Sequence, residues 1–301
     1  MSLFTSVKVI NSGKAILLYR KYGTPLRYHS TWLRDNALDS KTRDKSNGQR
    51  LITISDIPVN NYIESALLDK KGRNITLKFL PDKKEVKFSS KWLELYAYDK
   101  KTNNSKIWIN PNLKVWSNTT IKKIPVINYK TAKSNKKLLL RWLKSLHCFG
   151  FAKMSGCEKK SGTVTKIAKL FGYVRETNYG KWFDVKSKIN AVNLAFTNLS
   201  LQAHTDNPYR DPVPTIQILH CLKNSTEGGD SKVVDGFNAA IKLKKMNKKY
   251  FNLLSKYCSR FEFKGKKNVH LKSRFPMIGL TPDNELISIH FNNRSVAPIV
   301  D

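Results

Sequence analysis

The alternation of apolar and polar residues distinguishes the first part of the chain from the rest. Strand-like runs at residues 15–19, 51–54 and 74–79 are separated by turn residues such as Asn47-Gly48 and Pro81-Asp82. Between residues 88 and 98, Trp92, Leu95 and Tyr96 share one face of a short predicted helix that begins at Ser89-Ser90. The pattern predicts a small strand-rich N-terminal domain over residues 1–120.

From Pro125 onward, predicted helices come first and strands follow. Helical spacing of apolar residues predicts helices over residues 131–146, 164–171 and 239–257. Strands are predicted over residues 191–196, 215–221, 232–234, 261–264 and 285–291. A few helices followed by antiparallel strands suit a double-stranded β-helix, or jelly roll. We therefore predict a mainly β (α+β) chain with a jelly-roll domain over residues 121–301, and we find no internal repeat.

Composition and charge change this picture only in part. The 301 residues are 40% hydrophobic, which favours a globular chain, and their net charge is +33. The basic residues are mostly scattered lysines, arginine is sparse, and no zinc-finger or RNA-recognition pattern occurs. Nucleic-acid binding is therefore the weakest hypothesis, and we expect no nucleic-acid partner. A positive field would instead favour anionic small molecules such as dicarboxylates.

Cysteine usage and hydropathy bear on the compartment. Cys148, Cys157, Cys221 and Cys258 are widely spaced and fit no metal or redox pattern. No apolar run approaches the length of a membrane span, and the first twelve residues lack a signal-peptide core. These features predict a soluble cytoplasmic protein without a membrane partner.

The segment over residues 201–214 carries the candidate chemistry. His204 and Asp206 form a His-x-Asp pair beside a proline-rich loop. Alternation along an extended chain puts both side chains on one side, where imidazole and carboxylate can converge on one metal. A site of two histidines and one carboxylate leaves open positions on Fe(II) for a co-substrate and oxygen. Alone, the pair is a weak signal, and a surface histidine next to an aspartate is the ordinary alternative.

The wider context strengthens the metal interpretation. Residues 204–209, 217–222 and 228–237 closely resemble the iron-binding core of the γ-butyrobetaine hydroxylase family, in the taurine dioxygenase-like (TauD/TfdA-like) superfamily of 2-oxoglutarate oxygenases. Further segments match in order, so the resemblance runs over nearly the whole chain; they are residues 32–36, 47–50, 180–185, 193–196 and 291–293.

The resemblance implies roles for individual residues. His204 and Asp206 would bind Fe(II), and Asn193 would contact 2-oxoglutarate as co-substrate. Tyr179, Phe183 and Phe196 would form an aromatic cage for a trimethylammonium group, with Trp182 as the alternative to Phe183. A quaternary ammonium cannot donate hydrogen bonds, so ring faces are its natural partners. Ordinary core packing is the alternative for each ring.

The chain also departs from the family pattern. Residues 37–43 contain no cysteine or histidine where several relatives bind a structural zinc, so we expect no zinc. The family's second iron-binding histidine and its arginine for 2-oxoglutarate lie beyond the segment matched by residues 291–293, and the sequence ends at Asp301. His220, His270 and His290 fit neither position. These departures predict an incomplete jelly roll without the third ligand, aggregation-prone and inactive as it stands.

The implied reaction is carbon hydroxylation by an Fe(II)- and 2-oxoglutarate-dependent dioxygenase that consumes O2. The implied substrate is a small trimethylammonium compound, with γ-butyrobetaine to carnitine as the first choice. Two alternatives stay open: hydroxylation of a trimethylammonium alkylphosphonate, and an inactive homologue that acts as a binding partner. The oligomeric state, a homodimer included, also stays open.

Overall fold

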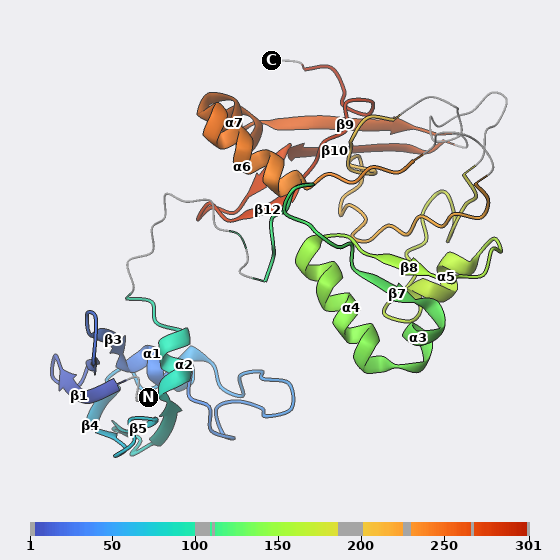
Figure 1. The fold of residues 1–301 in the computed structure, drawn as a ribbon. Helices are drawn as coiled ribbons and strands as arrows, with labels where there is room; N and C mark the ends of the chain where they lie inside the picture. The colour runs from blue at the N-terminus through green and yellow to red at the C-terminus, as the bar shows by residue number, and fades with distance from the viewer. Residues whose placement is uncertain are drawn as a thin grey trace. The chain divides into compact units, whose positions relative to one another are not determined.

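The computed structural model describes residues 4–99, 109, 112–185, 201–224, 230–265 and 268–299. The chain divides into two compact units, an N-terminal unit (Met1–Asn103) and a C-terminal unit (Asn104–Asp301). Both are drawn in Figure 1, and each is described by itself. Among the described residues, no helix combines the length and the apolar character that crossing a membrane would need.

The N-terminal unit contains two three-stranded antiparallel sheets that share one apolar core (Figure 1). The first sheet is β1 (Phe4–Ile10), β2 (Ala15–Arg20) and β3 (Leu26–His29), and the second is β4 (Tyr62–Leu68), β5 (Asn74–Leu80) and β6 (Glu85–Ser89). Alternation along β5 buries Ile75, Leu77 and Phe79 completely. The strands predicted at residues 15–19 and 74–79 are therefore confirmed.

Each sheet is followed directly by a short helix, α1 (Ser30–Asp35) after β3 and α2 (Ser90–Leu95) after β6. Ser89 caps α2 by accepting a hydrogen bond from the backbone N–H of Trp92 at 3.1 Å. The predicted start of this helix is confirmed. Its predicted span of residues 88–98 is too long, because Phe88 still belongs to β6.

The order of three strands and a helix thus occurs twice, and the two copies share residues at equivalent positions in and after the helix. Ser, Trp, Leu and Ala at positions 30, 32, 33 and 37 recur at positions 90, 92, 93 and 97. The backbone N–H of Ser30 donates to Lys14 O, and that of Ser90 donates to Arg73 O, both at 2.8 Å. The equivalent Trp32 and Trp92 rings pack together with centroids 5.6 Å apart. The expectation of no internal repeat is therefore wrong: identity is retained at scattered positions of the strand–helix junction and is lost along the strands.

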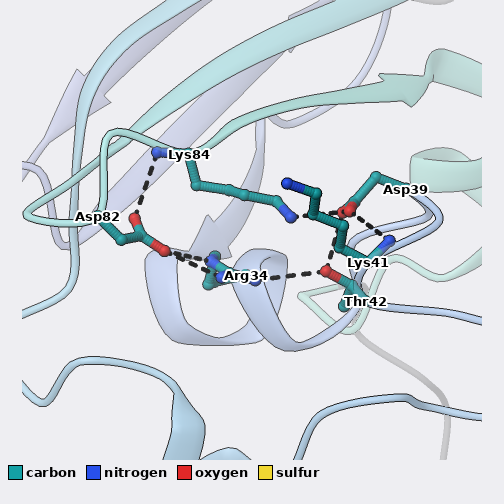
Figure 2. A network of polar contacts seen from close by, with 6 residues as sticks. All are labelled: Arg34, Asp39, Lys41, Thr42, Asp82 and Lys84. Carbon is teal, nitrogen blue, oxygen red and sulfur yellow. Dashed lines mark hydrogen bonds and ion pairs between the residues drawn. The ribbon is translucent and has the colours of Figure 1, made fainter.

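Each copy's helix also forms an ion pair with the other copy's strand turn, with the charges exchanged. Arg34 of α1 pairs with Asp82 at 2.9 Å, whereas Glu94 of α2 pairs with Arg20 at 3.6 Å. Figure 2 shows the first pair extending into a polar network within residues 34–42 and 82–84. Arg34 Nη1 donates to Thr42 Oγ1, the Thr42 hydroxyl donates to Asp39, and Lys84 Nζ donates to Asp39 at 2.7 Å.

Asp39 stays ionised at the centre of this network. Burial raises the pKa of its carboxyl, but hydrogen bonds from Lys84, Thr42 and the Lys41 backbone outweigh burial and hold the pKa below its usual value. The stretch of residues 37–43, where we expect no zinc, is thus joined to the turn after β5 directly by the Lys84–Asp39 ion pair and indirectly through Arg34, which contacts both Thr42 and Asp82 (Figure 2).

The described part of the C-terminal unit begins with helices around one parallel strand pair. The pair is β7 (Val126–Asn128) and β8 (Lys153–Ser155), joined through α3 (Tyr129–Ser134) and α4 (Lys136–Phe149). Trp142 on α4 is buried and donates its indole N–H to Lys153 O at 3.1 Å. α5 (Thr163–Ala168) confirms the helix predicted over residues 164–171, although it ends earlier.

The remaining elements are two helices and two antiparallel hairpins. The helices are α6 (Gly236–Met246) and α7 (Lys248–Lys256), and the hairpins are β9 (Cys258–Lys264) with β10 (His270–Pro276) and β11 (Ile278–Leu280) with β12 (Leu286–Ile289). Ala240 and Phe251 pack against Ile278 and Leu286, so both helices lie on the β11–β12 hairpin (Figure 1). β9 and β12 confirm the strands predicted at residues 261–264 and 285–291. The described residues fit a mainly β chain.

Several expected elements are absent or interrupted. The helices predicted over residues 131–146 and 239–257 are each two helices, broken at Asn135 and Asn247. Residues 51–54 do not form a strand, because Thr53 and Asp56 close a capping box over a short 3-10 helix (Ile54–Asp56). Residues 215–221 and 232–234 are not strands either, since no described backbone group forms a ladder with them. Residues 191–196 lie outside the described residues.

Candidate metal centre

His204 and Asp206 converge in the structure. Nε2 of His204 lies 3.0 Å from Oδ1 of Asp206, and both side chains are partly exposed. The other ring nitrogen, Nδ1, lies 2.6 Å from the backbone oxygen of Gln202. A carbonyl oxygen can only accept, so Nδ1 carries the hydrogen in this contact. Nε2 is then free to bind a cation next to the carboxylate oxygen.

This geometry fits a shared metal ion. Two donor atoms that bind one metal at about 2.1 Å and at a right angle to each other lie roughly 3.0 Å apart, the separation found here between Nε2 and Oδ1. Metal-binding histidines commonly donate their second N–H to a backbone carbonyl, which fixes the tautomer and the ring orientation. The backbone carbonyl of Gln202 is in the position that such a partner would occupy.

The backbone between the two residues is fixed by the segment that follows β12. Thr205 N–H donates to Phe291 O at 2.7 Å, and Phe291 N–H donates to Thr205 Oγ1 at 3.0 Å. The Asn292 amide also donates to Thr205 O at 3.2 Å. Thr205 is thus hydrogen-bonded through its N–H, its C=O and its hydroxyl. These bonds fix the backbone positions of His204 and Asp206 relative to each other.

Among the described residues, no third metal ligand lies beside His204 and Asp206. No group of three or more His, Cys, Asp or Glu side chains there could hold a metal ion. His270 lies on β10 and is bonded to Glu262 at 2.5 Å. His290 is buried against Phe275, and His220 lies in the irregular segment over residues 215–221.

The aromatic candidates separate into two groups. Tyr179 and Phe183 pack against each other with ring centroids 5.2 Å apart. Trp182 turns instead toward the start of α5, where its indole N–H donates to Ser161 Oγ at 3.3 Å and its ring lies over Gly162. Of the two alternatives, Phe183 is therefore the ring that joins Tyr179. Asn193 and Phe196 lie outside the described residues.

Two further rings belong to this cluster and were not among the predicted site residues. Phe263 on β9 lies 6.0 Å from Tyr179 and 4.9 Å from Tyr209, measured between ring centroids. Burial raises the pKa of the Tyr209 hydroxyl, so Tyr209 stays neutral. Tyr209 follows Asp206 by three residues, which was the only signal in the sequence; nothing local marks Phe263.

The chain is similar in sequence to known dioxygenases. The family model described as taurine catabolism dioxygenase TauD, TfdA family matches residues 119–301. The chain is 31% identical to the gamma-butyrobetaine dioxygenase of Homo sapiens over 278 residues, which cover 91% of this chain and 70% of that protein. It is 28% identical to the gamma-butyrobetaine dioxygenase of Pseudomonas sp. (strain AK-1), with 90% and 70% covered. The mitochondrial trimethyllysine dioxygenase of Bos taurus is 27% identical, with 91% and 65% covered.

Proposed function

Because this chain belongs to the TauD, TfdA family of dioxygenases, we propose that it hydroxylates a small trimethylammonium substrate, with γ-butyrobetaine as the first choice. The protein is an oxidoreductase of the dioxygenase type, as its relatives are. The finer assignment to γ-butyrobetaine is supported by the higher identity to the two gamma-butyrobetaine dioxygenases, 31% and 28%, than to the trimethyllysine dioxygenase of Bos taurus, 27%.

The observation that carries the proposal is the approach of His204 Nε2 to Asp206 Oδ1 at 3.0 Å, with the imidazole oriented by Gln202 O. These two side chains would hold Fe(II), and His-x-Asp pairs supply two of the three protein ligands in facial-triad sites. When bound, Fe(II) with 2-oxoglutarate and O2 supplies the chemistry that converts a C–H bond into C–OH. The protein's own task is to hold the target carbon beside that centre and exclude competing oxidation.

Tyr179 and Phe183 are proposed to receive the trimethylammonium head. A ring face attracts such a cation with roughly 0.5–2 kcal/mol, and more where water is excluded. Tyr179 is partly buried, Phe183 is about half exposed, and their rings are in contact. We place the catalytic domain in residues 121–301 and propose that its fold is of the jelly-roll type.

The test measures turnover by the natural protein in full. Wild type should consume 2-oxoglutarate and hydroxylate γ-butyrobetaine, whereas Asp206→Ala should lose both activities. The loss should exceed the roughly 10–100-fold that removal of an outer-shell partner of a metal ligand costs. Asp211→Ala, an exposed aspartate five positions further along the same loop, is the matched control and should keep its activity.

The same assay ranks substrates. γ-Butyrobetaine should exceed its dimethylamine analogue, because a dimethylammonium group keeps one hydrogen-bonded water and loses more on entering an aromatic cage. Trimethyllysine and a trimethylammonium alkylphosphonate serve as the competing candidates. Near-normal turnover by Asp206→Ala, or equal rates with taurine and γ-butyrobetaine, would contradict the proposal.

A further inference from the structure

Tyr209 lies at the junction of the candidate metal loop and the aromatic cluster. It follows Asp206 by three residues, and its side chain is 6% exposed. Its ring stacks on Phe263 of β9, with centroids 4.9 Å apart and planes inclined by 19°. The ring of Phe263 in turn contacts Tyr179. Tyr209 therefore reaches the cluster through its ring face.

The Tyr209 hydroxyl adds a second connection. It donates a hydrogen bond to Asn207 Oδ1 at 2.5 Å. Asn207, the residue after Asp206, adopts a left-handed backbone with φ of 51°, a conformation that asparagine tolerates better than most residues. Tyr209 thus joins the turn that leaves Asp206, which its hydroxyl contacts, to the aromatic cluster, on which its ring stacks.

The loop has other anchors, so its fold does not depend on this hydroxyl. Ser273 Oγ donates to Pro208 O, Arg210 Nη2 donates to Asn178 Oδ1, and Arg175 Nη1 donates to Val213 O at 3.2 Å. Replacing Tyr209 by Phe would keep the stacking on Phe263 and all three of these bonds. It would remove only the hydrogen bond from the Tyr209 hydroxyl to Asn207.

We propose that Tyr209 is a positioning residue, whose hydroxyl fixes the place of a bound quaternary ammonium group relative to the His204–Asp206 pair. The inference rests on the proposed function. Without the hydroxyl, the cation would still meet aromatic rings, but the target carbon would lie less steadily beside the reacting centre. Loss of an oriented substrate converts productive turnover into 2-oxoglutarate consumption without hydroxylation.

The experiment compares Tyr209→Phe with Tyr250→Phe, which removes a phenol from the exposed side of α7. Binding of the tetramethylammonium ion is measured by NMR titration, with neutral tert-butanol as the isosteric control. For wild type and each variant, the amount of 2-oxoglutarate consumed is compared with the amount of γ-butyrobetaine hydroxylated. Tyr209→Phe should weaken tetramethylammonium binding roughly threefold to tenfold, as loss of one hydrogen bond does. Tyr209→Phe should also consume more 2-oxoglutarate for each molecule of product formed. Tyr250→Phe should match wild type in both tetramethylammonium binding and this ratio.

Asn207→Gly removes the same hydrogen bond from the other end and keeps a left-handed backbone available. It should produce the same shift, and the double variant should be no worse than either single one. If Tyr209→Phe lowers the melting temperature, the binding and the stoichiometry of Asn207→Gly test the inference instead. Unchanged binding and unchanged stoichiometry in both variants would overturn the inference alone. If wild type does not prefer tetramethylammonium over tert-butanol, the proposed function fails and the inference fails with it.

Discussion

His290 is a buried imidazole to whose Nδ1 no residue in the described part of the chain offers a hydrogen bond. Its side chain is 8% exposed, its ring stands edge-on to Phe275 with centroids 4.5 Å apart, and Nδ1 makes no hydrogen bond within the described residues. Burial lowers the pKa of His290, because the charged imidazolium would be poorly solvated there. The folded state therefore holds this histidine neutral, and protonation opposes folding.

This burial predicts an acid-sensitive C-terminal unit. The contribution of neutral His290 to stability is fully present above the unfolded pKa of about 6.5 and is lost as the pH falls through the lower folded value. The urea midpoint of wild type should drop between about pH 7.5 and about pH 5.5. Over that range the free energy of unfolding should fall by at most about 1.4 kcal/mol per pH unit, the limit for one proton. His290→Leu should flatten this decline, and His147→Leu, at an exposed position of α4, should leave it unchanged. An identical pH profile for His290→Leu would show that other groups cause the loss.

The sequence could predict the neighbours of His204 but not those of Tyr209. Convergence of His204 and Asp206 follows from the two-residue period of an extended chain, a purely local property. The stacking of Tyr209 on Phe263 joins residues 54 positions apart through the β9–β10 hairpin, and no local pattern encodes that meeting. The same holds for Trp182 and Phe183: the sequence leaves both open, and the contact of Trp182 with Gly162 and Ser161 separates them.

Among the secondary-structure elements, two asparagines decide how the predicted long helices are divided. Asn135 and Asn247 each precede two lysines, and each side chain accepts a hydrogen bond from the backbone N–H three positions later. Both residues have extended backbone angles, so they end one helix and cap the next. Apolar periodicity continued across them, and this continuity led to single predicted helices. The capping chemistry of Asn-Lys-Lys was the better signal.

Removing one of these caps should be measurable. Asn247→Ala deletes the bond to Tyr250 N–H at 3.0 Å and should lower the free energy of unfolding by about 1 kcal/mol. Asn252→Ala, an exposed position inside α7, is the matched control and should be neutral or slightly stabilising because alanine favours helices. Urea denaturation followed by circular dichroism provides both values. Equal effects of the two substitutions would mean that Asn247 does not act as a cap.

Strand predictions succeeded where a partner strand is present and failed elsewhere. Residues 74–79 form β5 between two neighbours, whereas residues 215–221 have comparable β propensity but no hydrogen-bonded partner among the described residues. A strand is stabilised by its ladder and by burial of one face, and neither is a property of the segment alone. Ile216 and Leu219 are accordingly exposed.

At the scale of the whole molecule, the repeat in the N-terminal unit is hard to recognise in the sequence because both copies contribute to one core. The two copies contribute opposite walls of one apolar core, so most of their strand residues are only alike in being apolar. Exchange of charge between the Arg34–Asp82 and Arg20–Glu94 pairs removes sequence identity while it preserves the interaction. The repeat becomes visible through topology and through equivalent hydrogen bonds.

The net charge of +33 is a property of the whole sequence, and its consequence can be tested on the two substrates at once. A positive field raises the local concentration of a dianion such as 2-oxoglutarate, but it acts little on a zwitterion such as γ-butyrobetaine. Raising KCl from about 20 mM to about 300 mM shortens the screening length severalfold. The KM for 2-oxoglutarate should therefore rise severalfold in the natural protein, while the KM for γ-butyrobetaine should stay nearly constant. Steady-state assays at the two salt concentrations measure both values. A parallel rise in both would indicate general inhibition by salt, and no rise in either would mean that the lysines lie too far from the site to attract its anionic co-substrate.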